Sequence, residues 1–316
     1  MGLEKIKELA KILKEKDNFV LASHLRYDPD ALGSLVSLGL ILKKLNKNFF
    51  IYFEEELRPG HQFIPLQDKF TKNLDQDFDI AIVVDCDKLL LPGERFYSNL
   101  KGKFTILIDS HQTNVEDANL NVVMETNSNA AVEIIYYLTK ELGLDFDQDL
   151  ATAILFGILG DTLILTSELS REKYVKVFEI IKELVEKGGD YYLVVDAIKS
   201  KDWAKFKNEI ETLTKANLEG DILWLIVENE NVKHSAMANI LLQVREAKVV
   251  VAFKKEGSRV FISLRSKGNI DVAYLAKEYF NGGGHKNAAG GFLEMDINSA
   301  KNFVLEKLRE YLNNLV

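Results

Sequence analysis

Short apolar runs alternate with longer amphipathic stretches through the first half of the chain, and this alternation limits the fold more than any other feature. The apolar runs have the length and composition of buried strands, and they occupy residues 19–22, 48–53, 79–87 and 104–108. The amphipathic stretches have apolar residues at helical spacing, and they occupy residues 31–45, 129–142, 150–159 and 172–187. This alternation predicts an α/β domain with a parallel sheet and crossover helices.

A different pattern begins after Gly188 and Gly189. Helices are expected at residues 203–217, 236–244 and 271–280, and strands at 222–227, 249–253 and 260–264. Because 316 residues are many for one hydrophobic core, we expect two domains. The predicted division is a first domain at 1–187, a linker at 188–200 and a smaller α/β domain at 201–316.

The charge and composition exclude some classes of protein. A net charge of −8 disfavours a protein that coats long duplex DNA, although a short phosphorylated substrate fits if a bound metal ion supplies positive charge locally. No apolar run approaches the roughly 20 residues that span a bilayer, so no membrane association is expected. Cys86 is the only cysteine, which rules out an internal disulfide and suits the reducing cytoplasm.

Acidic and histidine side chains follow the predicted strands and one predicted helix. A single Asp after a strand is more often a helix cap or a turn former than a ligand. Several carboxylates brought together, however, repel one another unless a cation lies between them. Oxygen and nitrogen ligands without a thiolate pattern favour Mn²⁺ or Mg²⁺ over a structural zinc. The candidate residues are His24, Asp28, Asp30, Asp85, Asp109, His111 and Asp161.

A glycine-rich segment and an arginine stand out in the second half. Gly282, Gly283 and Gly284 precede His285, and exposed backbone N–H groups in such a segment can cradle an anion. Arg265 ends a predicted strand, where its guanidinium could pair with a phosphate. Taken singly, the glycines fit a flexible loop better, and the arginine fits a solvated strand end. No Gly-Lys-Ser/Thr sequence follows, which excludes a Walker loop.

Together these motifs resemble those of the DHH phosphoesterase family, and of its oligoribonuclease and pAp-phosphatase branch in particular. The resemblance rests on SHLRYDPDALGS, Asp85, Asp109-Ser110-His111, Gly160-Asp161-Thr162, SLRS and NGGGHKNAAGG. It implies a Rossmann-like N-terminal DHH domain, a DHH-associated C-terminal domain and an active site in the cleft between them.

The resemblance also implies a two-metal site. His24, Asp28 and Asp85 would hold one Mn²⁺. Asp30, Asp85 and Asp161 would hold the second, with Asp85 bridging, and Mg²⁺ could take the place of Mn²⁺.

Further roles follow from the same resemblance. His111 would contact the scissile phosphate, and Asp109 would orient neighbouring groups. Ser110 departs from the family, whose middle motif residue is a histidine that ligates the second metal, so that metal would be weakly bound, completed by water or absent. The residues implied to hold the far end of the substrate are Arg265, Gly282, Gly283, Gly284 and His285.

The implied function is hydrolysis of short single-stranded oligonucleotides or of 3′-phosphoadenosine 5′-phosphate (pAp) by metal-activated water. A phosphodiesterase for linear or cyclic dinucleotides is an alternative, as is a pyrophosphatase, although the glycine segment and Arg265 favour a nucleotide-sized ligand. Ser110 would support a nucleotide-binding protein with impaired catalysis. In the plainest alternative, the acids are caps on an ordinary α/β domain. The sequence leaves open whether the chain forms a homodimer.

Overall fold

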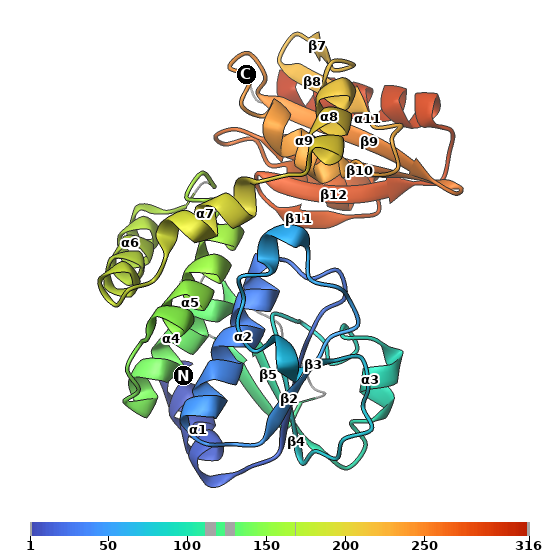
Figure 1. Cartoon of the computed structure of the whole chain (residues 1–316). Coiled ribbons are helices and arrows are strands. Elements are labelled where there is room, and N and C mark those ends of the chain that lie inside the picture. The colour runs from blue at the N-terminus through green and yellow to red at the C-terminus, as the bar shows by residue number, and fades with distance from the viewer. Residues whose placement is uncertain (1, 111–117, 124–129, 168, 315–316) are drawn as a thin grey trace. The chain divides into compact units, whose positions relative to one another are not determined.

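The structure is a computed structural model, and it describes residues 2–110, 118–123, 130–167 and 169–314. The chain divides into two compact units, Met1–Ser200 and Lys201–Val316, coloured blue to yellow and yellow to red in Figure 1. The stretch predicted as a linker, 188–200, belongs to the first unit and contains a helix, α7 (Tyr191–Lys199).

The first unit is built on a six-stranded sheet in the order β3-β2-β1-β4-β5-β6, and every neighbouring pair is parallel. Strands β1, β2 and β4 are buried along their whole length, which is why their sequences are continuous apolar runs. The predicted parallel α/β architecture is therefore confirmed. The strands are β1 (Phe19–Ser23), β2 (Phe49–Tyr52), β3 (Phe70–Thr71), β4 (Ile80–Val84), β5 (Phe104–Asp109) and β6 (Leu120–Val123).

Helices cover one face of this sheet, and a short helix with its loops covers the other (Figure 1). Glycine allows close packing on the helical side: a Cβ on Gly33 of α2 would lie 2.7 Å from the carbonyl oxygen of Ala153 in α5. On the other face, Phe96 of α3 packs into a second apolar cluster. The remaining helices are α1 (Gly2–Glu15), α2 (Pro29–Lys44), α3 (Glu94–Ser98), α4 (Ala131–Leu142), α5 (Gln148–Asp161) and α6 (Arg171–Glu186).

The second unit has a mixed sheet in the order β11-β12-β10-β9-β8-β7. Only β8 and β9 are parallel among its neighbouring pairs, and its two faces pack against α10 with α11 and against α9. The strands are β7 (Asn217–Glu219), β8 (Ile222–Ile226), β9 (Val249–Glu256), β10 (Arg259–Ser266), β11 (Gly283–His285) and β12 (Ala288–Leu293). The helices are α8 (Trp203–Leu213), α9 (His234–Leu241), α10 (Val272–Tyr279) and α11 (Ile297–Asn313).

The structure departs from the sequence prediction at several element ends. The helix expected from residue 31 begins at Pro29, because Asp28 caps it. The helix expected to reach residue 217 ends at Leu213, since Asn217–Glu219 pairs with β8 as β7. The pattern did not indicate β11 and β12, whose glycine and alanine residues are weak strand formers.

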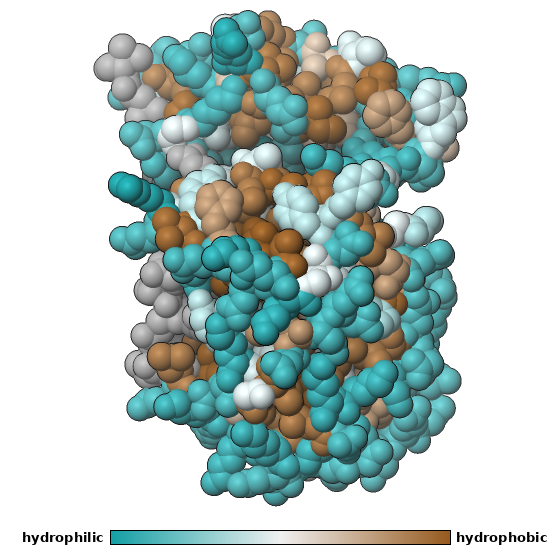
Figure 2. Space-filling model, turned by 60° about the vertical axis from the view of Figure 1, so that its left-hand side comes forward, coloured by the Kyte–Doolittle hydropathy of each residue, from teal (hydrophilic) through white to brown (hydrophobic). Residues whose placement is uncertain are grey.

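The described surface mixes hydrophilic and apolar side chains. Figure 2, in which the side of the molecule carrying α6 comes forward, shows apolar patches separated by hydrophilic surface. Exposed apolar residues on α6 include Val175, Phe178 and Val185. Among the helices of the described residues, none is both long and apolar enough to cross a membrane.

Candidate metal centre

The strand order of the first sheet places its reversal between β1 and β4. In open α/β sheets, ligands bind outside the carboxyl ends of the strands at this kind of switch point. Ser23 of β1 pairs with Val84 of β4, so the next residues, His24 and Asp85, leave the sheet side by side. The register of two buried strands therefore brings together groups that lie far apart in the sequence.

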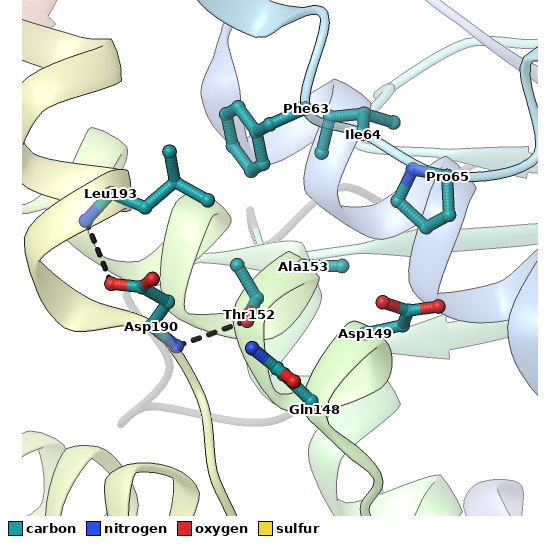
Figure 3. Close-up of a pocket in the computed structure, with 9 residues that line it drawn as sticks. All are labelled: Phe63, Ile64, Pro65, Gln148, Asp149, Thr152, Ala153, Asp190 and Leu193. Atoms are coloured by element: carbon teal, nitrogen blue, oxygen red, sulfur yellow. Dashed lines mark hydrogen bonds between the residues drawn. The ribbon is translucent and has the colours of Figure 1, made fainter.

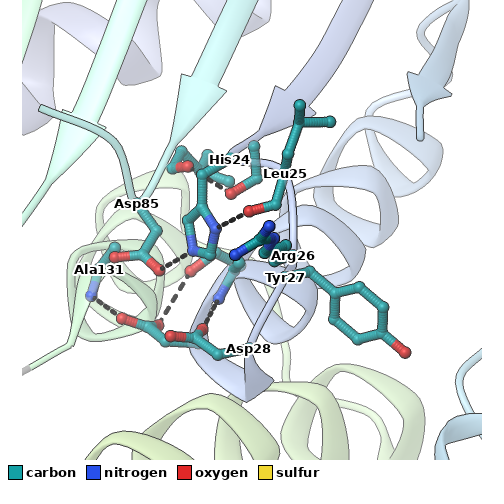
Figure 4. A network of polar contacts seen from close by, with 12 residues as sticks. His24, Leu25, Arg26, Tyr27, Asp28, Asp85 and Ala131 are labelled. Atoms are coloured by element: carbon teal, nitrogen blue, oxygen red, sulfur yellow. Dashed lines mark hydrogen bonds and ion pairs between the residues drawn. The ribbon is translucent and has the colours of Figure 1, made fainter. Parts of the chain in front are cut away.

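His24, Asp28 and Asp85 point toward one another at this edge (Figure 4). Each offers one ligand atom, and these atoms all lie within 4.8 Å of one another. His24 Nε2 is 3.4 Å from Asp85 Oδ2. An imidazole with two carboxylates at this spacing has the donor set that a divalent cation prefers, so these residues fit a metal ion.

The hydrogen bonds of His24 fix which ring nitrogen faces the cluster. Its Nδ1 lies 3.0 Å from the carbonyl oxygen of Leu25, so Nδ1–H donates there and Nε2 faces Asp85. The hydrogen bond with Asp85 raises the pKa of His24 to about 9, against the opposing effect of burial. Without metal, the ring is therefore protonated at neutral pH.

Asp85 occupies an unusual backbone position directly after β4. Its φ is 53°, in the left-handed region, and its N–H donates to the carbonyl oxygen of Ile108 at 2.8 Å. Burial raises the pKa of Asp85, His24 opposes that shift, and the charges of Asp28 and Asp109 add to it. A buried carboxylate in such surroundings favours a cation as a neighbour.

Asp28 and Asp30 stand at the start of α2 but have different surroundings. Asp28 is exposed, and its Oδ1 accepts the N–H of Ala31 at 3.0 Å as the helix cap. Asp30 is buried, and its two oxygens accept the N–H groups of Ala131 at 2.6 Å and Val132 at 3.0 Å, at the start of α4. Asp30 therefore ties the start of α2 to the start of α4.

Asp161 reaches the same region from the end of α5. Burial raises the pKa of Asp30 well above its usual range, and the charges of Asp85, Asp161 and Asp28 raise it further. Gly160 permits this approach, because a Cβ there would lie only 2.2 Å from Cβ of Pro29. The ligand atoms that lie within 4.8 Å of one another belong to His24, Asp28 and Asp85, and among the described residues Asp30 and Asp161 are not part of that group.

The chain leaves Asp161 through a strained turn. Leu163, Ile164 and Leu165 have φ values of 49°, 57° and 61°, a left-handed conformation that costs each non-glycine residue about 1–2 kcal/mol. The side chain of Thr162 supports the turn, since its hydroxyl accepts the N–H of Leu165 at 3.3 Å. Strain next to a chemical site is a recurring property of functional loops.

The predicted catalytic pair is only partly described. Asp109 is the last residue of β5 and is fully buried, and its charge contributes to the raised pKa of Asp85. Ser110 is half-buried beside it. His111 lies outside the described residues.

The second unit holds the other predicted residues. Arg265, on β10, donates from Nε to Oδ1 of Asn239 on α9 at 2.6 Å and from Nη1 to the carbonyl oxygen of Leu264 at 2.8 Å. The glycine-rich segment is a strand edge rather than a loop: β11 pairs with β12, and Gly282, Gly283, Gly284 and His285 are exposed. Sequence reasoning missed Asn239, for which no local signal exists because its partner is on another element.

A small cavity lies at the other end of α5 from Asp161. Its volume is about 70 Å³, and apolar side chains from the segment after residue 62 face polar ones from α5 and from Asp190, the residue that caps α7, across it (Figure 3). Thr152 Oγ1 accepts the N–H of Asp190 within it at 3.0 Å. This cavity holds none of the predicted site residues. It is lined by Phe63, Ile64, Pro65, Gln148, Asp149, Thr152, Ala153, Asp190 and Leu193.

Two family models match the chain. The N-terminal domain of the DHH family matches residues 18–158, and the DHHA1 domain matches residues 222–314. The first match spans β1 to most of α5, and the second spans β8 to α11.

Individual proteins are similar over nearly the whole chain. The bifunctional oligoribonuclease and PAP phosphatase NrnA of Thermus thermophilus is 26% identical, over 98% of this chain and 95% of that protein. An exopolyphosphatase-related protein from Bacteroides fragilis has a TM-score of 0.84 at 22% identity and covers 99% of this chain and 97% of its own. RecJ from Thermus thermophilus, solved with Mn²⁺, has a TM-score of 0.58 at 17% identity, and the match covers 99% of this chain and 55% of RecJ. The two solved structures share the fold, and the chain contains the N-terminal domain of the DHH family followed by a DHHA1 domain.

Proposed function

We propose that this protein is a metal-dependent phosphoesterase that hydrolyses short oligonucleotides, pAp or both. The observation that carries the proposal is the convergence of His24, Asp28 and Asp85 within 4.8 Å at the switch point of a parallel sheet. The similarity to an oligoribonuclease and PAP phosphatase over nearly the whole chain supports the substrate class.

His24, Asp28 and Asp85 are proposed to hold the first divalent ion, with Mn²⁺ preferred and Mg²⁺ as a substitute. RecJ, which shares the fold of this chain, was solved in complex with Mn²⁺, and this is consistent with the proposed ion. A bound ion would lower the pKa of a water molecule and neutralise charge on the phosphate. The Nδ1–H bond of His24 to Leu25 keeps Nε2 directed at the ion.

A second ion is proposed to bind between Asp30, Asp85 and Asp161, more weakly than the first. Asp30 already accepts two backbone N–H groups, which leaves it fewer lone pairs for an ion. Ser110 offers a neutral oxygen where the family has a ligating histidine, and this weakens the site further.

The remaining roles are proposed from the sequence resemblance. His111 would contact the scissile phosphate, and Asp109 would orient groups around Asp85. The second unit would hold the nucleotide, with Arg265, braced by Asn239, pairing with a phosphate. The other proposed contacts to substrate are the exposed edge residues Gly282, Gly283, Gly284 and His285.

The test measures hydrolysis of 5′-labelled di- to pentanucleotides and of pAp by the full chain with Mn²⁺, Mg²⁺ or EDTA. We expect Mn²⁺-dependent release of mononucleotides or phosphate, with dinucleotides cleaved fastest. Asp85→Asn should lower kcat by about 10³-fold, as for other groups that stabilise transition-state charge. Asp87→Asn, which removes a neighbouring charge outside the ligand set, should stay within a few-fold of the unaltered chain.

Two results would count against this function in different ways. Absence of hydrolysis and of metal binding across several divalent ions would exclude a phosphoesterase. Metal-independent nucleotide binding without hydrolysis would instead support the binding protein that Ser110 suggests. The lone cysteine supports a cytoplasmic location as part of the same proposal.

A further inference from the structure

Tyr27 lies within the segment that carries the proposed ligands, which we call the metal loop (residues 24–30). It directly precedes Asp28, yet its side chain points away from His24, Asp28 and Asp85 (Figure 4). The side chain is only 1% exposed. A large buried ring in an otherwise polar turn has no part in binding an ion, so its contacts show another purpose.

The Tyr27 ring packs against Phe53, with 5.0 Å between ring centres, and its other contacts come from a second segment, residues 55–61, which we call the clamp segment. The hydroxyl of Tyr27 accepts the N–H of Arg58 at 2.8 Å and lies 3.2 Å from Nδ1 of His61. The guanidinium of Arg58 lies 4.4 Å from the centre of the Tyr27 ring and donates to the carbonyl oxygen of Tyr27. The ring, the hydroxyl and the backbone of Tyr27 are therefore each held.

Glu55, also in the clamp segment, holds the backbone of the metal loop. Its Oε1 accepts the N–H groups of Arg26 and of Tyr27, the latter at 3.1 Å. Arg26 has a φ of 63°, a left-handed conformation that a non-glycine residue adopts at a cost of about 1–2 kcal/mol. The metal loop is thus kept in an unfavourable conformation by contacts outside it.

The clamp segment is itself braced against two helices. The His61 ring packs edge-on to Phe156 of α5, with 4.9 Å between ring centres. Gly60 packs against α7, because a Cβ there would lie 3.0 Å from the carbonyl oxygen of Ala197. The clamp segment therefore connects the metal loop to the helical layer that also positions Asp161.

We propose that Tyr27, Arg58 and His61 are positioning residues that fix the metal loop, so that Asp28 and His24 are already placed for a divalent ion. This inference rests on the proposed function. None of the three residues would touch ion or substrate. Their loss would leave every ligand in the chain and let the loop relax from its strained conformation, and the ion would then have to restore that conformation on binding.

The test compares Mn²⁺ affinity, by titration calorimetry or by the EPR signal of free Mn²⁺, in the full chain and its variants. Tyr27→Phe removes the hydroxyl and keeps the ring. Tyr27→Leu removes both. Groups that orient metal ligands typically contribute 10- to 100-fold in affinity. We expect Tyr27→Phe to weaken Mn²⁺ binding about 10-fold and Tyr27→Leu about 100-fold, with hydrolysis restored when Mn²⁺ is in large excess.

Tyr136→Phe is the matched control. Tyr136 is also buried, and its hydroxyl also contacts two groups, Glu183 and Lys140, but neither of these groups belongs to the metal loop or to the clamp segment. We expect this variant to lose stability in EDTA, as Tyr27→Phe does, and to bind Mn²⁺ as the unaltered chain does.

The outcomes separate this inference from the proposed function. If Tyr27→Phe binds Mn²⁺ as tightly as the unaltered chain, or if Tyr136→Phe weakens binding equally, the clamp is structural and the inference is overturned. If the unaltered chain still binds Mn²⁺ and hydrolyses its substrate in that case, only this inference is overturned and the proposed function is kept. If the unaltered chain binds no divalent ion, both are overturned. Tyr27→Phe keeps the ring packing, so the test does not depend on Tyr27→Leu folding.

Discussion

The two units present their chemical groups in opposite ways. In the first, the side chains of His24, Asp28 and Asp85 converge because the register of β1 and β4 and the start of α2 place them at one point. In the second, the candidate binding edge β11 is exposed backbone with almost no side chains. Ion binding and stability in the first unit should therefore change when a charge is removed, and stability in the second unit should change when a single methyl group is added.

The largest expected effect tests the second unit. Gly282→Ala would place a Cβ 1.9 Å from the carbonyl oxygen of Gly290 and 2.5 Å from Cα of Gly291, so β11 would separate from the sheet. We expect a loss of about 3 kcal/mol in the free energy of unfolding, at the upper end for overpacking, measured by urea denaturation.

Gly283→Ala is its control, because nothing lies within 4 Å of the added Cβ. Its stability should be unchanged. A raised KM for a dinucleotide in this variant would sharpen the comparison by separating a binding role of the edge from a structural one. Equal stability of both variants would mean that the close approach at Gly282 is not needed.

The next effect concerns protons at the metal centre. The pKa of His24 is about 9 without metal, above its usual value, so at lower pH a proton occupies the nitrogen that an ion needs. Mn²⁺ affinity should fall about tenfold for each pH unit between 8 and 6, since one proton is displaced per ion. Calorimetry at several pH values would measure this.

His24→Gln provides the comparison. It keeps a polar side chain without a titrating ring, so its weaker Mn²⁺ binding should depend less on pH over the same range. A slope as steep as that of the unaltered chain would assign the proton to another group.

A smaller effect distinguishes stability from function at Asp85. Burial and neighbouring acids raise its pKa above the value in the unfolded chain, so its charge opposes folding once the pH exceeds that unfolded value. In EDTA at pH 7, Asp85→Asn made in a His24→Gln background should therefore melt at a higher temperature than His24→Gln alone, because no protonated imidazole then loses its carboxylate partner. Added Mn²⁺ should reverse the order, because only the chain that keeps Asp85 gains stability from the ion. If the chain with Asn at position 85 melts at the lower temperature both in EDTA and in Mn²⁺, the charge of Asp85 does not oppose folding.

The smallest effect concerns the turn after Asp161. Leu163 is 47% exposed and has a φ of 49°, so Leu163→Gly removes an unfavourable conformation and little packing. We expect a gain of about 1 kcal/mol in stability. Val175→Gly, at a 51% exposed position inside α6, should lose about 1 kcal/mol by the ordinary helix propensity of glycine. Thermal unfolding of the two variants should therefore shift in opposite directions.

Much of the first unit could be predicted from the sequence because its determinants are local. Buried parallel strands are continuous apolar runs, and the residues that follow them share one edge of the sheet. That reasoning selects His24, Asp28 and Asp85 as candidates, and the structure places their ligand atoms within 4.8 Å of one another.

What the sequence did not indicate depends on contacts between distant segments. Glu55, Arg58 and His61 hold Tyr27 from another part of the chain, and no pattern within 24–30 indicates this. Asp30 appears equivalent to Asp28 in the sequence, but the start of α4 binds its carboxylate. The strand β11 was missed because glycine-rich segments have little intrinsic strand preference.

The contact between Gly160 and Pro29 links two positions that are far apart in the chain. Even the smallest side chain at 160 would collide with the ring of Pro29, and alanine at 29 would keep the atom that blocks it. Only glycine at 29 would free that space. Among relatives of this chain, positions 29 and 160 should therefore change together, with a side chain at no more than one of them. Each such change would keep the spacing between Asp30 and Asp161, the residues that follow these two positions.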